Sequence, residues 1–147
     1  MKINVCMVAE TKPDFVSRQI MERIGAPYSH AAIIYKDLVY HCIERGVCVQ
    51  NLADGLHHSK IVVSKEVELN CTEDAFFAFM QGALDKDYSE LQLVGFIFPK
   101  MAKYVADGRS ELICSEFVAW VLVELAGYKF SEELDFVDPR ELFESLK

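Results

Sequence analysis

Short apolar runs rich in β-branched residues, each bounded by turn residues, fill much of the first half of the chain. Such runs predict β-strands. The turn residues Lys36-Asp37 stand between two of them, which predicts a hairpin. Together the runs predict a meander of about five short strands. The predicted strands are residues 3–8, 29–35, 38–43 and 47–52, followed by a β-rich stretch made of 61–63 and 67–69.

Apolar residues three to four positions apart predict helices in the other segments. Their ends carry suitable residues: a proline in a first turn, a capping box of Asn70 and Glu73, and stopping glycines at 25 and 127. The pattern predicts an α+β fold of one domain, residues 1–147, in which a small antiparallel sheet packs against helices on one side. The predicted helices run from Pro13 to Ile24, from Asn70 to Asp87-Tyr88-Ser89, from residues 110–114 to Ala126, and from Asp138 to Leu146.

Composition narrows the range of partners. A chain of 147 residues with 52% hydrophobic content can build one sizeable core. The net charge is −8 and the basic residues are scattered, which argues against binding to nucleic acid or to anionic membrane surfaces. The chain turns polar too early for a signal peptide, and no apolar run could span a bilayer. We therefore expect a soluble, cytoplasmic protein.

Candidate chemistry begins with the cysteines, of which there are five at irregular spacing and without a CxxC pair. Most are expected to be reduced core residues. Cys114 differs because it lies within a turn of a predicted helix N-terminus, where free N–H groups and the helix dipole favour the thiolate and lower the thiol pKa. The alternative interpretation is a small hydrophobic core residue.

Two histidines on neighbouring predicted strands could serve this thiol. His30 opens an apolar strand, so its ring needs a polar partner and is a candidate base, or else a core histidine satisfied by a carbonyl group. The hairpin could bring His41 beside it to orient the ring. Glu44 is the rival third residue, but alternation along an extended strand places His41 and Glu44 on opposite faces.

A zinc site formed by His30, His41 and Cys114 is the competing chemical interpretation. No pair of ligands at local metal-binding spacing supports it, so we expect no metal and no other cofactor. His57 and His58 lie in a segment of turn residues and are assigned no role.

Five motifs occur in the order YSHAAIIY, VYHCIERGVCVQNL, KDYSELQL, ICSEFVAWVL and DPRELFESL. In this order they resemble the circularly permuted NlpC-like papain-fold cysteine peptidases and amidases, the YiiX-like group related to lecithin retinol acyltransferase. In that family a strand-borne histidine comes first, a second polar residue follows on the next strand, and the cysteine helix comes late. The resemblance therefore implies a permuted papain-like fold with the catalytic cysteine at a helix N-terminus.

The resemblance also implies roles for single residues. Cys114 would attack an amide or ester carbonyl and form a thioester, His30 would act as the base, and His41, in preference to Glu44, would be the third member. Tyr88 falls where the family often has a tyrosine that could line the substrate groove. Expected substrates are a peptide, an isopeptide or a lipid ester, and an acyltransferase of the same fold or a non-catalytic binding module are the alternatives.

Overall fold

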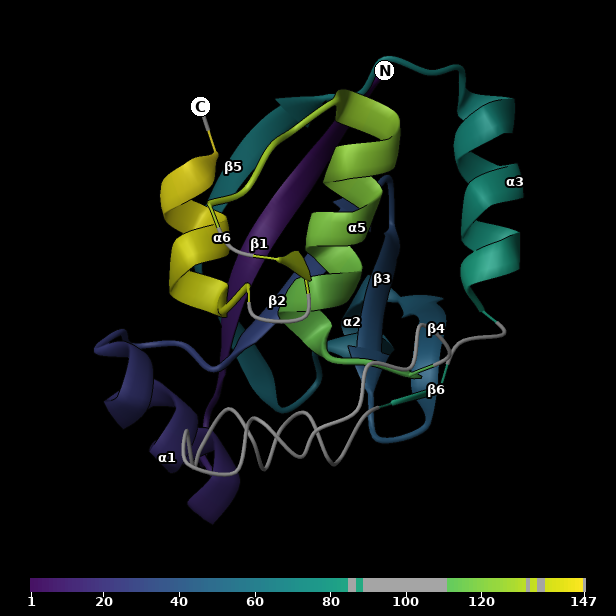
Figure 1. The fold of residues 1–147 in the computed structure, drawn as a ribbon. Helices are drawn as coiled ribbons and strands as arrows, with labels where there is room; N and C mark the ends of the chain where they lie inside the picture. Colours follow the sequence, from purple (N-terminus) through teal and green to yellow (C-terminus); the bar gives the residue numbers. More distant parts are fainter. Residues whose placement is uncertain (85–86, 89–110, 132, 135–136, 147) are drawn as a thin grey trace.

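The computed structural model describes residues 1–84, 87–88, 111–131, 133–134 and 137–146 (Figure 1). The architecture is α+β, as predicted, with a five-stranded antiparallel sheet and a separate two-stranded one. The elements are β1 (Lys2–Glu10), α1 (Phe15–Ile24), β2 (His30–Tyr35), β3 (Leu38–Ile43), β4 (Gly46–Asn51), α2 (Leu52–Gly55), β5 (Ser59–Glu68), α3 (Glu73–Ala83), β6 (Asp87–Tyr88), β7 (Glu111–Leu112), α5 (Cys114–Ala126) and α6 (Pro139–Ser145).

The order of strands in the large sheet is β4-β3-β2-β1-β5, and all neighbours are antiparallel. The predicted hairpin of β2 and β3 is confirmed. The predicted meander is confirmed for β1 to β4 and wrong for β5, which pairs with β1 rather than with β4. The physical reason is that β1 buries both of its faces, with Val5 and Met7 on one and Cys6 and Val8 on the other. A strand that is apolar on both faces belongs in the interior of a sheet.

Strand β5 is one continuous strand, although the polar residues 64–66 divided it into two stretches in the sequence pattern. Those residues are tolerated because β5 is a terminal strand of the sheet and exposes much of its surface. Its register against β1 shifts between Met7 and Val8, which pair with Val63 and Ile61. Val62 is therefore the extra residue of a β-bulge.

Helix α1 begins two residues later than its sequence pattern predicted. Asp14 is the N-cap, and its carboxylate accepts a hydrogen bond of 2.7 Å from the N–H of Ser17. Pro13 therefore precedes the cap and does not lie in the first turn. Gly25 ends the helix as predicted, with a left-handed φ of 62°.

Helix α3 is capped by Thr72, not by Asn70. The Thr72 hydroxyl accepts from the N–H of Ala75 at 3.2 Å, while the Asn70 side chain donates to the carbonyl of Ala126 at 3.3 Å. The helix ends at Ala83, and residues 87–88, which were predicted to end it, form strand β6 instead. Ser89 lies outside the described residues.

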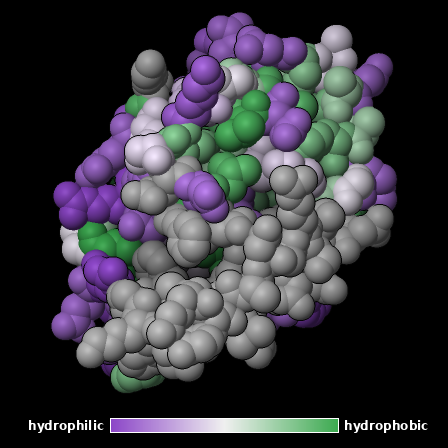
Figure 2. All heavy atoms as spheres, in the orientation of Figure 1, coloured by the Kyte–Doolittle hydropathy of each residue, from purple (hydrophilic) through white to green (hydrophobic). Residues whose placement is uncertain are grey.

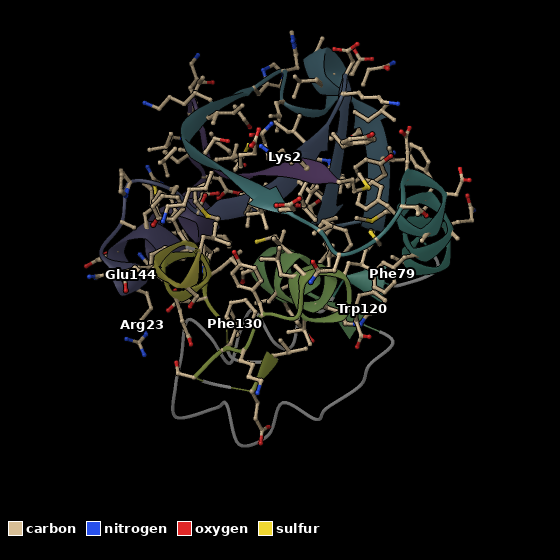
Figure 3. The ribbon with its side chains drawn as sticks, turned by 90° about the horizontal axis from the view of Figure 1, so that it is seen from above. Lys2, Arg23, Phe79, Trp120, Phe130 and Glu144 are labelled. Atoms are coloured by element: carbon tan, nitrogen blue, oxygen red, sulfur yellow. The ribbon has the colours of Figure 1, made fainter. Side chains whose placement is uncertain are left out.

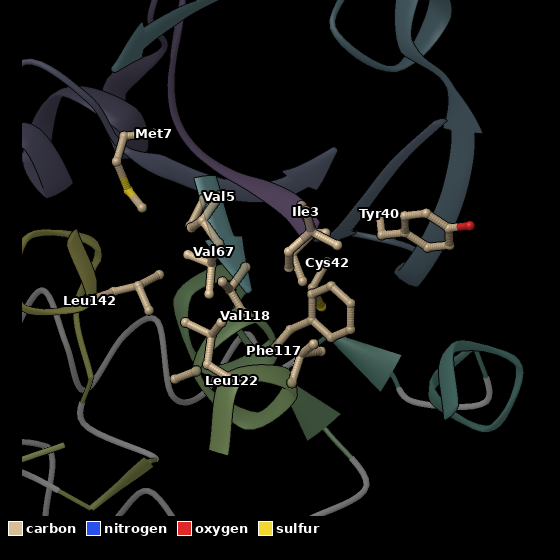
Figure 4. Close-up of a cluster of buried hydrophobic side chains, with 14 of the residues drawn as sticks. Ile3, Val5, Met7, Tyr40, Cys42, Val67, Phe117, Val118, Leu122 and Leu142 are labelled. Atoms are coloured by element: carbon tan, nitrogen blue, oxygen red, sulfur yellow. The ribbon is translucent and has the colours of Figure 1, made fainter. Parts of the chain in front are cut away.

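Helix α5 crosses one face of the sheet, with α3 and α6 on either side of it (Figure 1). Phe79 of α3 lies against Trp120 of α5, with ring centroids 4.7 Å apart (Figure 3). On the face drawn in Figure 2, hydrophobic residues gather around α3 and α5. The main core lies between α5 and the sheet (Figure 4), and its fully buried side chains include Ile3, Val5, Met7, Ile33, Phe117, Val118, Leu122 and Leu142.

The opposite face of the sheet carries a smaller cluster made of Cys6, Val8, Ala32, Ile34 and Val39, covered by Leu52 and Leu56. These two leucines belong to α2 and the residue that follows it. The prediction that all helices lie on one side is therefore wrong for α2. Among the described helices, none is both long enough and apolar enough to cross a bilayer.

One glycine at a helix end and one inside a helix offer a matched pair for a stability test. Gly127 caps α5 with φ 71°, whereas Gly82 lies inside α3 with open space where a Cβ would stand. Gly127→Ala should lower the free energy of unfolding by about 1 kcal/mol, because alanine is strained in the left-handed region. Gly82→Ala should raise it by about 0.5 kcal/mol through helix propensity. Urea unfolding midpoints of both variants check the opposite signs.

Candidate active site

Cys114 is the first residue of α5, so the predicted helix start is confirmed. Ile113 before it is extended, with φ −99° and ψ 167°. The carboxylate of Glu116 turns back and accepts from the N–H of Ile113 at 3.4 Å, which ties the first turn together. Phe117 and Val118 are fully buried against the sheet. Packing one turn further along thus fixes the position of Cys114.

Strands β2 and β3 pair only near the turn that joins them. The ladder includes Tyr35 with Leu38, Ile34 with Val39, and Ile33 with Tyr40, and it ends there. Beyond this point the start of β2 and the end of β3 are no longer paired in the described ladder. The start of β2 remains paired with β1, where His30 lies opposite Val8. Helix α5 packs across β2 and β3. Its first residue, Cys114, lies at this part of β2, because the N–H of Ala31 hydrogen bonds to the Cys114 sulfur.

The Cys114 thiol is surrounded by donors. The N–H groups of Ala31, Ser115 and Cys114 itself hydrogen bond to the sulfur and lower the thiol pKa, and the Ser115 side chain acts in the same direction. The Ser115 hydroxyl is fully buried and, within the described part of the chain, has no hydrogen-bond partner of good geometry. These groups are arranged to stabilise negative charge once it forms on the sulfur.

Burial nevertheless outweighs these donors, and the pKa of the Cys114 thiol lies above its ordinary value. The prediction of a lowered pKa at the helix N-terminus is therefore wrong for this state of the protein. Burial also raises the pKa of Cys42, to which Cys114, Cys48 and Glu116 contribute as neighbouring acidic groups. Cys114 rests here as a neutral thiol.

His30 and His41 lie against each other, as the hairpin and the strand parity predicted. Nε2 of His30 and Nδ1 of His41 are 3.2 Å apart, and the rings meet edge to face with centroids 5.3 Å apart. His41 is buried, whereas Glu44 is exposed in the turn after β3. The structure therefore brings His41, and not Glu44, to His30.

Burial keeps both imidazoles neutral. It is the main cause that lowers the pKa of His30 to about 3, and the neighbouring His41 lowers it further. Burial also lowers the pKa of His41, an effect partly offset by its hydrogen bond to Gln50. Among the described residues, the Cys114 sulfur makes no hydrogen bond to the His30 ring. It contacts the N–H of Ala31, the next residue in the chain.

Gln50 belongs to the same cluster, and the sequence interpretation missed it. Its Oε1 lies 2.8 Å from Nε2 of His41. The β3–β4 register pairs His41 with Cys48 and Val39 with Gln50, so all four side chains share one face of the sheet. The available signal was a polar residue on β4 two positions beyond the partner of His41, which strand alternation places on the same face.

The backbone of Tyr88 lies near the start of α5. Strand β6 runs parallel to β7 and pairs Tyr88 with Leu112, two residues before Cys114. Its side chain lies outside the described part of the structure. The predicted role of Tyr88 in substrate binding stays a prediction.

Groups of three or more histidine, cysteine, aspartate or glutamate side chains that could hold a metal ion do not occur among the described residues. His30, His41 and Cys114, the ligands of the zinc interpretation, are all described and do not form such a group. Each ring nitrogen of His41 already has a partner within hydrogen-bonding distance.

Comparison of the sequence with protein-family models and with curated proteins found no match to either. The candidate site is therefore interpreted from its own geometry.

The raised thiol pKa predicts how Cys114 reacts with iodoacetamide. The thiolate is the reactive form, so a raised pKa leaves a smaller reactive fraction at neutral pH. We expect the alkylation rate of Cys114 to keep rising with pH to about pH 9 and beyond, the upper end of the ordinary thiol range. Mass spectrometric mapping of labelled peptides measures it. A rate plateau near about pH 6 or 7 would instead indicate a preformed thiolate.

The lowered pKa of His30 predicts an acid-sensitive fold. Below the unfolded pKa of about 6.5 the unfolded chain binds a proton at this residue that the folded protein excludes until about pH 3. Its contribution to stability is therefore complete above about pH 6.5 and is lost as pH falls, by about 1.4 kcal/mol per pH unit. Urea unfolding of wild type and His30→Asn between about pH 7 and 5 should show a steeper loss for wild type. Parallel curves would contradict the assignment.

Proposed function

We propose that the protein is a cysteine hydrolase with a permuted papain-like fold, which cleaves an amide or ester bond through a thioester. One observation carries the proposal. A half-buried imidazole, His30, contacts the buried imidazole of His41, and the residue after His30, Ala31, donates its N–H to a thiol at a helix N-terminus. Buried titratable groups with displaced pKa values are typical of catalytic sites. Core packing alone gives no reason to place two imidazoles in contact with each other at this point of the sheet.

In the proposed reaction, the Cys114 sulfur attacks the carbonyl carbon of the substrate. Its proton passes to the His30 ring as the carbon–sulfur bond forms. The carbonyl oxygen takes the negative charge, and N–H groups at the start of α5 stabilise it. His30 returns the proton to the leaving amine or alcohol. A water molecule then gives a proton to His30 and attacks the thioester carbonyl, and the carbon–sulfur bond breaks. The carboxylic acid leaves, and His30 returns the proton to the Cys114 sulfur.

The neutral resting state fits a mechanism in which proton transfer accompanies attack. With its pKa lowered to about 3, the ring of free His30 has little tendency to take the proton of the thiol. Charge separation becomes favourable only when substrate places a carbonyl group beside the donors at the helix start. His41 orients the His30 ring through the 3.2 Å contact, a role that Glu44 in its exposed turn does not share.

The order of the motifs also supports the proposal. The histidine strand β2 precedes β3 with His41, and the cysteine helix α5 comes late, which is the order of the permuted papain-like enzymes. The proposed substrates are a peptide, an isopeptide or a lipid ester, and Tyr88 is the residue proposed to bind them. An acyltransferase would form the same thioester and resolve it with an alcohol or amine in place of water.

A binding module that has kept the fold without turnover is the second candidate. The raised pKa of the Cys114 thiol favours it, because a binding protein has no need of a reactive thiolate. So does the lack of a hydrogen bond between the described Cys114 sulfur and the His30 ring. Reaction with an activated ester separates the two candidates, since a binding module forms no acyl-enzyme.

An activated ester should acylate Cys114 in the wild-type protein. We expect a burst of about one equivalent of nitrophenolate from 4-nitrophenyl acetate, as for other covalent intermediates. Cys114→Ala should abolish the burst, and His30→Ala should slow it about 100-fold, the usual loss when a general base is removed. Stopped-flow absorbance measures the burst, and Cys71→Ala, which changes a partly exposed cysteine, is the control. A burst that survives Cys114→Ala would contradict the proposal.

His41 and Glu44 form a matched pair in the same assay. His41→Ala should slow acylation about 10-fold, because the His30 ring loses the partner that orients it. Glu44→Gln should change the rate less than about 3-fold, since its side chain is solvated. The reverse ranking in folded variants would make Glu44 the orienting residue.

A further inference from the structure

The His30–His41 pair continues into a third polar side chain. Nε2 of His30 faces Nδ1 of His41, and Nε2 of His41 faces Oε1 of Gln50 at 2.8 Å. Each neutral imidazole carries one proton on its two nitrogens. The positions of the protons along this chain are therefore coupled, and the group at its end decides them.

Only two arrangements of protons satisfy both contacts. If the Gln50 oxygen faces His41, Nε2 of His41 must donate to it, and Nδ1 of His41 then accepts from Nε2 of His30. Nδ1 of His30 is left without a proton and can act as a base. If the amide nitrogen of Gln50 faced His41 instead, every donor would reverse. His30 would then carry its proton on Nδ1 and could not accept one there.

The surroundings of Gln50 favour the first arrangement. The thiol of Cys48 also donates to Oε1, at 3.8 Å, so two donors converge on an atom that has two lone pairs. The side chain is also held in place by α2. A Cβ added at Gly55 would stand 2.3 Å from Cγ1 of Val39 and 3.2 Å from Cβ of Gln50. Gly55 thus lets α2 lie directly over the base of the Gln50 side chain.

We propose that Gln50 is a positioning residue that sets the tautomers of His41 and His30, so that His30 presents an unprotonated Nδ1. The inference rests on the proposed function, in which that nitrogen takes the proton of Cys114. Gln50 acts through His41 and does not touch the reacting atoms. The amide is suited to this task because it accepts a hydrogen bond without adding a charge that would protonate the pair.

Tautomers can be read directly by long-range ¹⁵N–¹H correlation spectra of histidine-labelled protein at about pH 7, where both rings are neutral. We expect His30 and His41 to carry their protons on Nε2. Comparison with single variants of the exposed His57 and His58 assigns the signals. A His30 proton on Nδ1 in the wild-type protein overturns the inference without recourse to any variant.

Gln50→Met removes the acceptor at nearly constant volume, and Cys48→Ser keeps a donor to the same oxygen. Gln50→Met should give mixed tautomers at both histidines and slow acylation of Cys114 by 4-nitrophenyl acetate about 10-fold, in the range of orienting partners. Cys48→Ser should keep both tautomers and change the rate less than about 3-fold. Wild-type tautomers in folded Gln50→Met would overturn the role of Gln50.

The spectra test the role of Gln50 and the ester assay tests the proposed hydrolase, so either claim can be refuted without the other. The tautomers are measured without substrate, so they report on Gln50 even if the protein is not a hydrolase. Nε2 protons that depend on Gln50, in a protein that forms no acyl-enzyme, support the positioning role and refute the proposed hydrolase. An ester burst together with an Nδ1 proton on His30 supports the hydrolase and refutes the inference.

Discussion

Most side chains of helix α5 are apolar. The helix is therefore stable only when these side chains are packed against the sheet. Phe117, Val118 and Leu122 have no exposed surface, and full burial of each such side chain contributes about 1.5 to 3 kcal/mol. This term is far larger than any single polar contact near the helix start. Packing of the helix therefore decides where Cys114 lies, and the polar groups around the thiol adjust to that position.

The same packing explains why the position of Cys114 at a helix N-terminus does not lower its thiol pKa. A helix N-terminus stabilises a negative charge by about 0.3 to 1 kcal/mol when it is exposed. Removal of a thiolate from water costs more than this unless the N–H donors around it compensate fully. At Cys114 the donors recover only part of the cost. The N–H donors thus face the Cys114 sulfur although the thiol is neutral and carries no charge for them to stabilise.

Local signals predicted the elements well, because they act over a few residues. Turn residues fixed the hairpin of β2 and β3, glycines marked the ends of α1 and α5, and strand parity placed His41 beside His30. Pairing between distant strands was not predictable in the same way. That β1 lies inside the sheet depends on the burial of both its faces, which the weak alternation of its sequence did not reveal. Gln50 was missed because its role depends on the register of β4 against β3.

The β-bulge at Val62 has a consequence for the free edge of the large sheet. β5 is the last strand in the order, so its outer N–H and C=O groups could pair with a strand of another molecule. The bulge breaks the even spacing of these groups, and Lys60 and Glu66 add exposed charges along the strand. A ten-residue edge is thereby made a poor template for intermolecular β-pairing, which protects the folded protein against aggregation at its longest exposed strand.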